Sequence, residues 1–269
     1  MSATIFKHEF NARLKSVLIW SVSMVLLILI FFSLYPSFSQ QAALLDQVLS
    51  KMPPALLEAF GISNLDMASL LGFFSLVWLF VQLCLAIQAG DYGFGLVSVE
   101  ESELTADFLM TKPVSRMQVL NSKLLAAICS LLVTDAIVYA TTFICIALFG
   151  SGKTYDMTTL VLILLGLMLF QLFFLSVGLV VSLIVRRIRS VTPYGMGLAF
   201  GAYIINGFSG IFGDIKLEYI TPFKHFDAAY IILHASYNWP LVILNVVVSV
   251  ICLVASYWLY LRKDIHAVS

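Results

Sequence analysis

The side chains best suited to chemistry in this chain lie in a polar stretch, residues 98–116, between two long apolar runs. Glu100, Glu103 and Asp107 are spaced by three and four residues, so a helix would place their carboxylates on one face. Phe108 would lie on an adjoining apolar face. Such a two-faced helix is a candidate docking element for another protein in the cytoplasm, and a solvated loop with an acidic face is the alternative.

Local signals mark where this helix would begin and end. Ser98, three residues before Glu101, fits a capping box and predicts a helix start at Ser98. Pro113 ends the helix, because the residue before a proline avoids the α region. Ser115, three residues before a glutamine, fits a second capping box that opens the next helix. We therefore expect a short, two-faced helix at about residues 98–112, rigidly joined to the membrane helix that follows it.

Asp135 is the one acidic residue near the middle of a long apolar run. A charge at the centre of a membrane costs at least about 2.5 kcal/mol, so this side chain should face the helix bundle or a cavity, or carry a proton. One interpretation is that Asp135 lines a substrate cavity and contacts substrate or a coupling ion. The other is a structural hydrogen bond to a neighbouring helix.

Other chemistries find little support in the sequence. The four histidines are scattered without a metal-ligand spacing, and no catalytic residues are expected. The stretch Gly150-Ser-Gly-Lys-Thr154 resembles part of a phosphate-binding loop, but it lacks the first glycine at the required distance and follows no soluble strand. We therefore expect no metal, cofactor or nucleotide site in this chain.

The elements that must position these residues are membrane helices. The chain is 61% hydrophobic and 11% charged, whereas soluble domains carry about 25% charged residues. Its formal net charge of +0 offers no basic surface for nucleic acid. Since a span needs about 20 apolar residues, we predict an all-α integral membrane protein, a single domain over residues 1–269. Six spans are expected, at about 17–35, 68–90, 118–148, 158–185, 192–212 and 239–261.

Orientation follows from the basic residues. Eleven of the 15 Lys and Arg residues fall on one side of these spans, which places both termini and the polar stretch in the cytoplasm of a multi-pass cell membrane protein. Residues 1–16, with Phe6, Phe10 and Leu14 at a spacing of four, are expected to form an amphipathic interfacial helix. The glycine-rich fifth span is the weakest, and the aromatic segment 213–238 should pack as short interfacial helices.

The polar stretch at residues 98–116 resembles a segment of the permease subunits of ABC-2-type exporters, which carry a coupling helix between their second and third spans. The family pattern has acidic residues, Gly-Thr, a Leu pair, Pro-Val/Ile-Ser-Arg and a following Lys. This chain departs from it at Leu104, where the glycine is usual. The matching residues are Glu101, Glu103, Thr105, Asp107, Phe108, Leu109, Pro113, Val114, Ser115, Arg116 and Lys123. The segments 54–61, 221–227 and 262–264 also resemble this family.

The resemblance implies a six-span ABC-2-type exporter fold in the cell membrane of a bacterium or archaeon, in which two permease subunits pair, as a homodimer or with a paralogue. It implies that a separate ABC ATPase subunit binds ATP and Mg and docks on the coupling helix. Glu100, Glu103, Asp107 and Phe108 would face that ATPase, and Pro113 and Ser115 would form the joint to the third span. The remaining coupling residues would be Glu101, Thr105, Leu109 and Arg116.

Three other functions compete with a permease. An intramembrane enzyme would need paired catalytic groups within the spans, and Asp135 stands alone there. An ion-coupled secondary transporter usually has several intramembrane ionisable groups or repeated halves. A non-transporting membrane scaffold or immunity protein could share the same fold. The substrate is not readable from the sequence.

Overall fold

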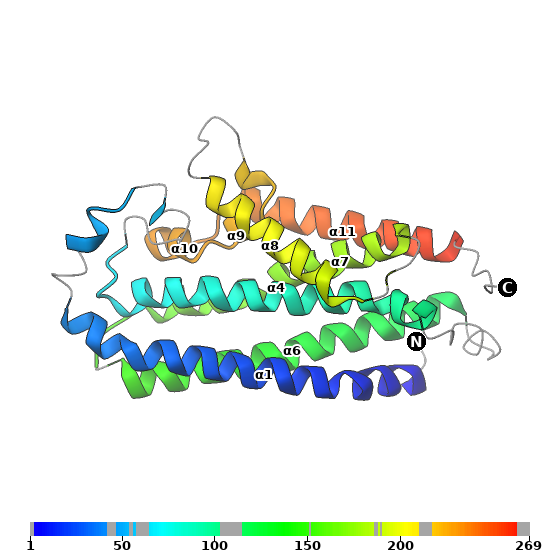
Figure 1. Cartoon of the computed structure of the whole chain (residues 1–269), viewed down its shortest axis with the longest axis horizontal. Helices are drawn as coiled ribbons and strands as arrows, with labels where there is room; N and C mark the ends of the chain where they lie inside the picture. The colour runs from blue at the N-terminus through cyan, green and yellow to red at the C-terminus, as the bar shows by residue number, and fades with distance from the viewer. Residues whose placement is uncertain are drawn as a thin grey trace.

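The computed structural model describes residues 3–41, 47–53, 56–57, 65–102, 115–150, 152–185, 188, 190–209 and 217–262, with residues 99–102 described through their backbone alone. This described part is helical and contains no strand. Five of its helices are long and apolar enough to cross a membrane, by length and composition (Figure 1). They are α1 (Ala3–Gln40), α4 (Leu70–Ser102), α6 (Arg116–Phe149), α7 (Met157–Ile184) and α11 (Trp239–Arg262).

The long helices lie side by side along the length of the molecule (Figure 1). The main contacts are those of α1 with α6, of α4 with α7, and of α7 with α11. In its most apolar window α4 is 72% buried, against 28% for α1 and for α11, so α4 is the central helix. We call the end of the bundle that holds Ala3 and Arg262 the base. Segment 103–114 joins α4 to α6 at the base, and the choice of this end as cytoplasmic remains a prediction.

The first helix differs from the expectation for residues 1–16. A separate interfacial helix is not present, because α1 runs without a break from Ala3 to Gln40. The physical reason is local: no glycine or proline occurs before Pro36, and the ion pair between Glu9 and Arg13 at 3.2 Å supports the helix where the break was expected. The amphipathic pattern of Phe6 and its neighbours therefore belongs to the first turns of a much longer helix.

The predicted helix start at Ser98 is wrong. Helix α4 continues through Ser102, and the Ser98 hydroxyl donates to the Phe94 carbonyl at 2.6 Å, as a serine inside a helix does. The three glycines shortly before it, Gly90, Gly93 and Gly95, do not break α4, because close packing holds that part of the helix: a Cβ on Gly93 would lie 2.3 Å from the Leu175 carbonyl oxygen of α7. The second span is thus the first part of a helix that ends within the polar stretch.

The predicted start of the third span is confirmed. Ser115 is the N-cap of α6, and the full capping box with Gln118 is present. The fourth and sixth predicted spans correspond to α7 and α11 with small shifts at their ends.

The fifth predicted span corresponds to α8 (Thr192–Ser209), which packs against α4. Its 18 residues form one continuous helix about 27 Å long, slightly shorter than the roughly 30 Å hydrocarbon core of a bilayer. It is not among the candidate spans. Five spans are therefore supported by length and composition, and the sixth remains a prediction.

The aromatic segment before α11 packs as short helices, as expected. It contains the 3-10 helix η1 (Leu217–Tyr219), α9 (Pro222–His225) and α10 (Ala228–His234). Phe223 and Phe226 are each 2% exposed and meet the Phe170 ring of α7 edge-on. This segment therefore closes the end of the bundle opposite the base.

Candidate coupling site at the base of the bundle

The structure describes only the two edges of the predicted coupling helix. Glu100 and Glu101 lie in the last turn of α4, through their backbone. Ser115 and Arg116 form the start of α6. The other predicted coupling residues lie outside the described residues: Glu103, Thr105, Asp107, Phe108, Leu109 and Pro113.

The capping box fixes where α6 begins. The Gln118 amide N–H donates to the Ser115 hydroxyl, and the Ser115 amide N–H donates to Gln118 Oε1, both at 3.3 Å. Two N–H groups that the helix cannot satisfy itself are satisfied in this way. The first turn of α6 is therefore stabilised against fraying, starting at Ser115.

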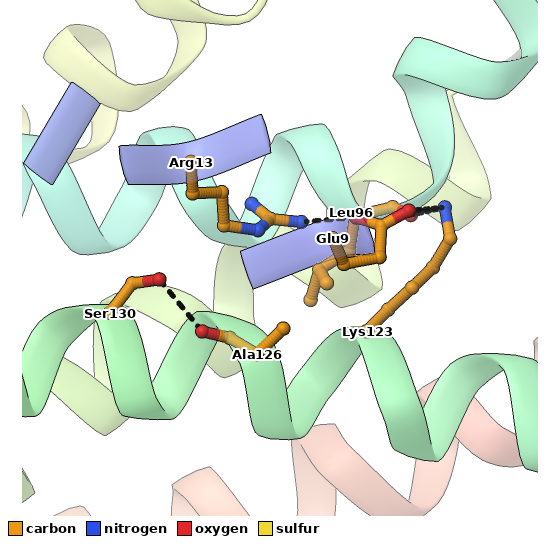
Figure 2. Close-up of polar contacts among 6 residues, drawn as sticks. All are labelled: Glu9, Arg13, Leu96, Lys123, Ala126 and Ser130. Carbon is orange, nitrogen blue, oxygen red and sulfur yellow. Dashed lines mark hydrogen bonds and ion pairs between the residues drawn. The ribbon is translucent and has the colours of Figure 1, made fainter. Parts of the chain in front are cut away.

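Lys123 ties three helices together about two turns into α6. Its side chain is buried, with 3% of the residue exposed. The ammonium group donates to the Leu96 carbonyl of α4 at 2.9 Å and lies 3.7 Å from the Glu9 carboxylate of α1 (Figure 2). A single cation thus joins the helix before segment 103–114, the helix after it, and the first helix of the chain.

The charges around Lys123 compensate one another. Burying an ammonium group is costly unless it is paired and hydrogen-bonded. Glu9 supplies the opposite charge and also accepts from the Arg13 guanidinium at 3.2 Å. Because Glu9 lies between two cations, compensation is partial: the cluster of Glu9, Arg13 and Lys123 carries one net positive charge, with Lys123 buried and the other two side chains partly exposed.

A chain of polar contacts leads from this cluster toward the middle of the bundle. Arg13 lies over the Tyr92 ring, 5.4 Å from its centre. The Tyr92 hydroxyl donates to the Ser16 hydroxyl at 3.2 Å. The Gln88 amide donates to Tyr92 at 3.3 Å and to Thr134 of α6 at 3.0 Å. We call this set the basal polar network: Glu9, Arg13, Ser16, Gln88, Tyr92, Lys123 and Thr134.

Asp91 on α4 is a second acidic residue inside the bundle, and it lies against the first turns of α8. A Cβ on Gly195 of α8 would be 2.2 Å from Asp91 Oδ1, so only glycine fits there. Helix N-termini favour nearby anions. Asp91 therefore helps to position α8 against α4. Sequence analysis placed Asp91 just past the end of the second span and gave it no role.

Asp135 and Gln171 lie inside the bundle, on α6 and α7 respectively. Asp135 is 1% exposed and Gln171 is 0% exposed. The structure thus places Asp135 among packed helices rather than on an open face of this chain.

The other stretches that sequence analysis considered do not contribute to the base. The segment after Gly150 joins α6 to α7 at the opposite end, where the Lys153 ammonium donates to the Ala68 carbonyl at 2.8 Å and lies over the Tyr35 ring. Among the described residues, no group of three or more His, Cys, Asp or Glu side chains could hold a metal ion.

Lys123 was already named as part of the family's sequence pattern, whereas no local pattern assigned a role to Glu9, Arg13 or Tyr92. One signal was available for Lys123: a lysine inside an apolar run must find partners when the helix is buried. The identity of those partners depends on contacts between residues 27 and 114 positions apart, which no local pattern reveals.

Comparison with known proteins agrees with this arrangement. A family model described as ABC-2 family transporter protein matches residues 3–265, nearly the whole chain. No curated protein and no solved structure gives a significant match. Because the family match covers the bundle, its base and the segment between α4 and α6, the chain belongs to the ABC-2 transporter family and is a multi-pass ABC transporter permease.

Proposed function

We propose that this permease is an exporter subunit driven by a separate ABC ATPase that docks on the segment between α4 and α6. The ATPase binds ATP and Mg, while this chain binds neither. Two permease subunits pair in the cell membrane to form the substrate path, and the base of each bundle faces the cytoplasm. Glu100, Glu103, Asp107 and Phe108 form the docking face, and Pro113 and Ser115 the joint.

The observation that best supports this proposal is the position of Lys123. Its ammonium group bonds to Leu96 at 2.9 Å, so the helices on either side of the docking segment are joined just inside the bundle. Its ion pair with Glu9 extends the connection to α1. A force applied to segment 103–114 would then move the bases of three helices together instead of bending one of them.

The capping box at Ser115 adds to this stiffness. If the first turn of α6 were frayed, a small displacement of segment 103–114 would only bend that turn. Because the turn is capped, the same displacement moves the whole helix. ATP binding and hydrolysis on the partner would shift the docking segment, and α6 would transmit the shift along about 50 Å of helix. The coupling is thus a rigid-body movement of packed helices, one of the known forms of conformational switching.

The docking proposal is tested by purifying tagged chain from its native membranes and identifying the ABC ATPase that accompanies it. The single substitutions Glu103→Lys and Asp107→Lys are each expected to reduce the ATPase recovered at least tenfold. Glu218→Lys is the matched control, because Glu218 is an exposed acid in η1 at the opposite end of the bundle. Unchanged ATPase recovery in both docking variants would reject the proposed docking face.

The export direction needs a separate test. In inside-out membrane vesicles the cytoplasmic face points outward, so added ATP should drive uptake of the cargo into the vesicle lumen. A nonhydrolysable ATP analogue should not. ATP-driven loss of cargo from such vesicles would instead assign import to this permease.

A further inference from the structure

Asp135 places a carboxyl group deep in the helix bundle without a partner to neutralise it. The residue lies about 28 Å along α6 from Arg116 and is 1% exposed. Neither of its carboxyl oxygens has a hydrogen-bond partner among the described residues. No ion pair joins Asp135 to a described Lys or Arg either, since the described ion pairs involve Glu9 and Asp227. A carboxylate in this position would be a bare charge inside the membrane.

Gln171 of α7 is the polar side chain that meets this carboxyl across the α6–α7 contact. Its amide lies near the Asp135 carboxyl, although the two side chains do not meet in hydrogen-bond geometry. Gln171 is completely buried, and both its Nε2 and its Oε1 lack a hydrogen-bond partner in the described part of the chain. Two neighbouring helices thus bring together one carboxyl and one amide whose four polar atoms are all unused.

The surrounding elements supply no compensating cation. On α6 itself, Tyr139 is committed to the Leu164 carbonyl at 2.6 Å, and Tyr237, which precedes α11, donates to the Leu162 carbonyl. Helix α7 has no ionisable side chain. The charged residues of α1 that reach α6 act through Lys123, about 18 Å away along the helix.

The two other helices that pack against α6 do not neutralise Asp135 either. On α4 the ionisable groups near this level are Cys84, a free thiol, Asp91, which lies against α8, and Tyr92, which bonds to Ser16. On α11, Tyr257 donates to Asn121 of α6, far below Asp135, and Arg262 lies over the Trp258 ring at the base. An ionised carboxyl at Asp135 would therefore remain uncompensated, which a membrane interior strongly disfavours.

We propose that Asp135 is a proton-binding site within the membrane and that Gln171 completes it. The carboxyl takes one proton from water and is neutral. Its O–H donates to Gln171 Oε1, and Gln171 Nε2 donates to the other carboxyl oxygen. This acid–amide pair satisfies groups on both helices that otherwise lack partners, and it needs no space for an ion or a water molecule.

The site links proton binding to the contact between α6 and α7. While the helices stay packed, the proton stays on Asp135, because ionisation would leave a bare carboxylate. The proton can leave only when water reaches the carboxyl, and this requires α6 and α7 to separate at this level. Proton release therefore favours an open arrangement of the two helices, by the usual linkage between binding and conformation.

Infrared spectroscopy of the full chain in dodecyl maltoside, a detergent without ester carbonyls that would absorb in the same region, tests the proposal without any partner or substrate. At about pH 8 exposed carboxyl groups are ionised, so a carbonyl stretching band of a protonated carboxylic acid must come from a shielded group. We expect such a band in the native chain, its loss in Asp135→Asn, and its retention in Asp91→Asn. Absence of the band in the native chain, or its persistence in Asp135→Asn, would overturn the proposal.

A second pair of variants tests the role of Gln171 and holds even if Asp135→Asn does not fold. Gln171→Leu removes the amide that bonds the acid, so the band should move to higher wavenumber. Gln82→Leu removes another fully buried glutamine amide, which instead donates to the Phe226 carbonyl at 3.1 Å, and should leave the band in place. Labelling the aspartate carboxyl carbons with ¹³C identifies the band as aspartate. A band that does not move in Gln171→Leu would contradict the acid–amide pair.

This site is independent of ATPase docking. The infrared measurement uses the permease alone, so it can fail while docking on segment 103–114 stands, and docking can fail while the proton site stands.

Discussion

The Lys123 ammonium of α6 and the Leu96 carbonyl of α4 are 2.9 Å apart inside the bundle, on opposite sides of segment 103–114 in the sequence. The two helices that flank this segment are therefore joined to each other before they enter the body of the bundle. Glu9 of α1 joins the same ammonium group at 3.7 Å. The base is thus a unit of three helices held by one buried cation, and this unit is what a partner on segment 103–114 would move.

Replacing Lys123 with methionine should weaken this unit. Lys123→Met keeps a long apolar side chain but loses the bond to Leu96 and the pair with Glu9, so we expect the free energy of unfolding to fall by about 1–3 kcal/mol. Thermal unfolding in detergent measures the change. Lys15→Met, at an exposed site on α1, is the control and should be within about 0.5 kcal/mol of the native chain. Equal effects of the two substitutions would show that Lys123 does not hold the base.

The capping box should contribute measurably to α6. Ser115→Ala removes the acceptor of the Gln118 N–H, and we expect a loss of about 1 kcal/mol in the free energy of unfolding. Ser115→Asp keeps an acceptor at the N-cap, so its free energy of unfolding should stay close to that of the native chain. Ser130→Ala serves as the matched control: Ser130 lies inside α6, its hydroxyl donates only to the Ala126 carbonyl of its own helix (Figure 2), and its loss should be nearly neutral.

Glycine at position 93 is predicted to be required for packing. A Cβ on Gly93 would lie 2.3 Å from the Leu175 backbone oxygen, which cannot move without shifting α7, so Gly93→Ala should destabilise by about 1–3 kcal/mol. Gly201 on α8 is the matched control, because its Cβ would meet nothing within 4 Å. Gly201→Ala should be neutral or slightly stabilising, since alanine favours helices. Melting temperatures of the two variants in the same detergent test this contrast.

Sequence patterns predicted those parts of the fold that depend on local chemistry. The apolar runs located the five long helices, and Ser115 with Gln118 located the start of α6. The pattern at Ser98 and Glu101 misled, because a serine followed by a glutamate fits equally well inside a helix whose preceding turn continues. Helix continuity was the missing information at that site.

Local sequence patterns were also insufficient for α1 and for the candidate site. A change from amphipathic to apolar sequence near residue 16 does not end a helix when no breaker residue is present. The partners of Lys123 lie in α4 and α1, so they emerge only when the bundle is assembled. Burial likewise showed that Asp135 and Gln171 both lie inside the bundle, which spacing alone left open.

Stability should depend on pH through His225, at the end of the bundle opposite the base. Burial lowers the pKa of His225 below its ordinary value near 6.5, although the nearby backbone of Tyr219 and Glu218 partly opposes this shift. The folded state therefore binds a proton less readily than the unfolded state. The contribution of His225 is complete above about pH 6.5 and is lost as the pH falls through the lower folded pKa.

Thermal unfolding measured between about pH 5 and 8 checks this expectation. The melting temperature should fall toward acidic pH in the native chain and fall less in His225→Gln. His234→Gln, which replaces an exposed histidine on α10, should keep the native pH dependence. A pH dependence that His225→Gln leaves intact would assign the effect to other groups.

Photo-cross-linking at Phe108 tests the central claim most directly. The photoreactive analogue p-benzoylphenylalanine keeps an aromatic side chain at that position, and native membranes keep any partner in place. The proposal predicts an adduct between the permease and an ABC ATPase when the analogue replaces Phe108, and no such adduct when it replaces Tyr219 at the opposite end of the bundle. Absence of an ATPase adduct from position 108, or an equal adduct from position 219, would contradict docking on the segment between α4 and α6.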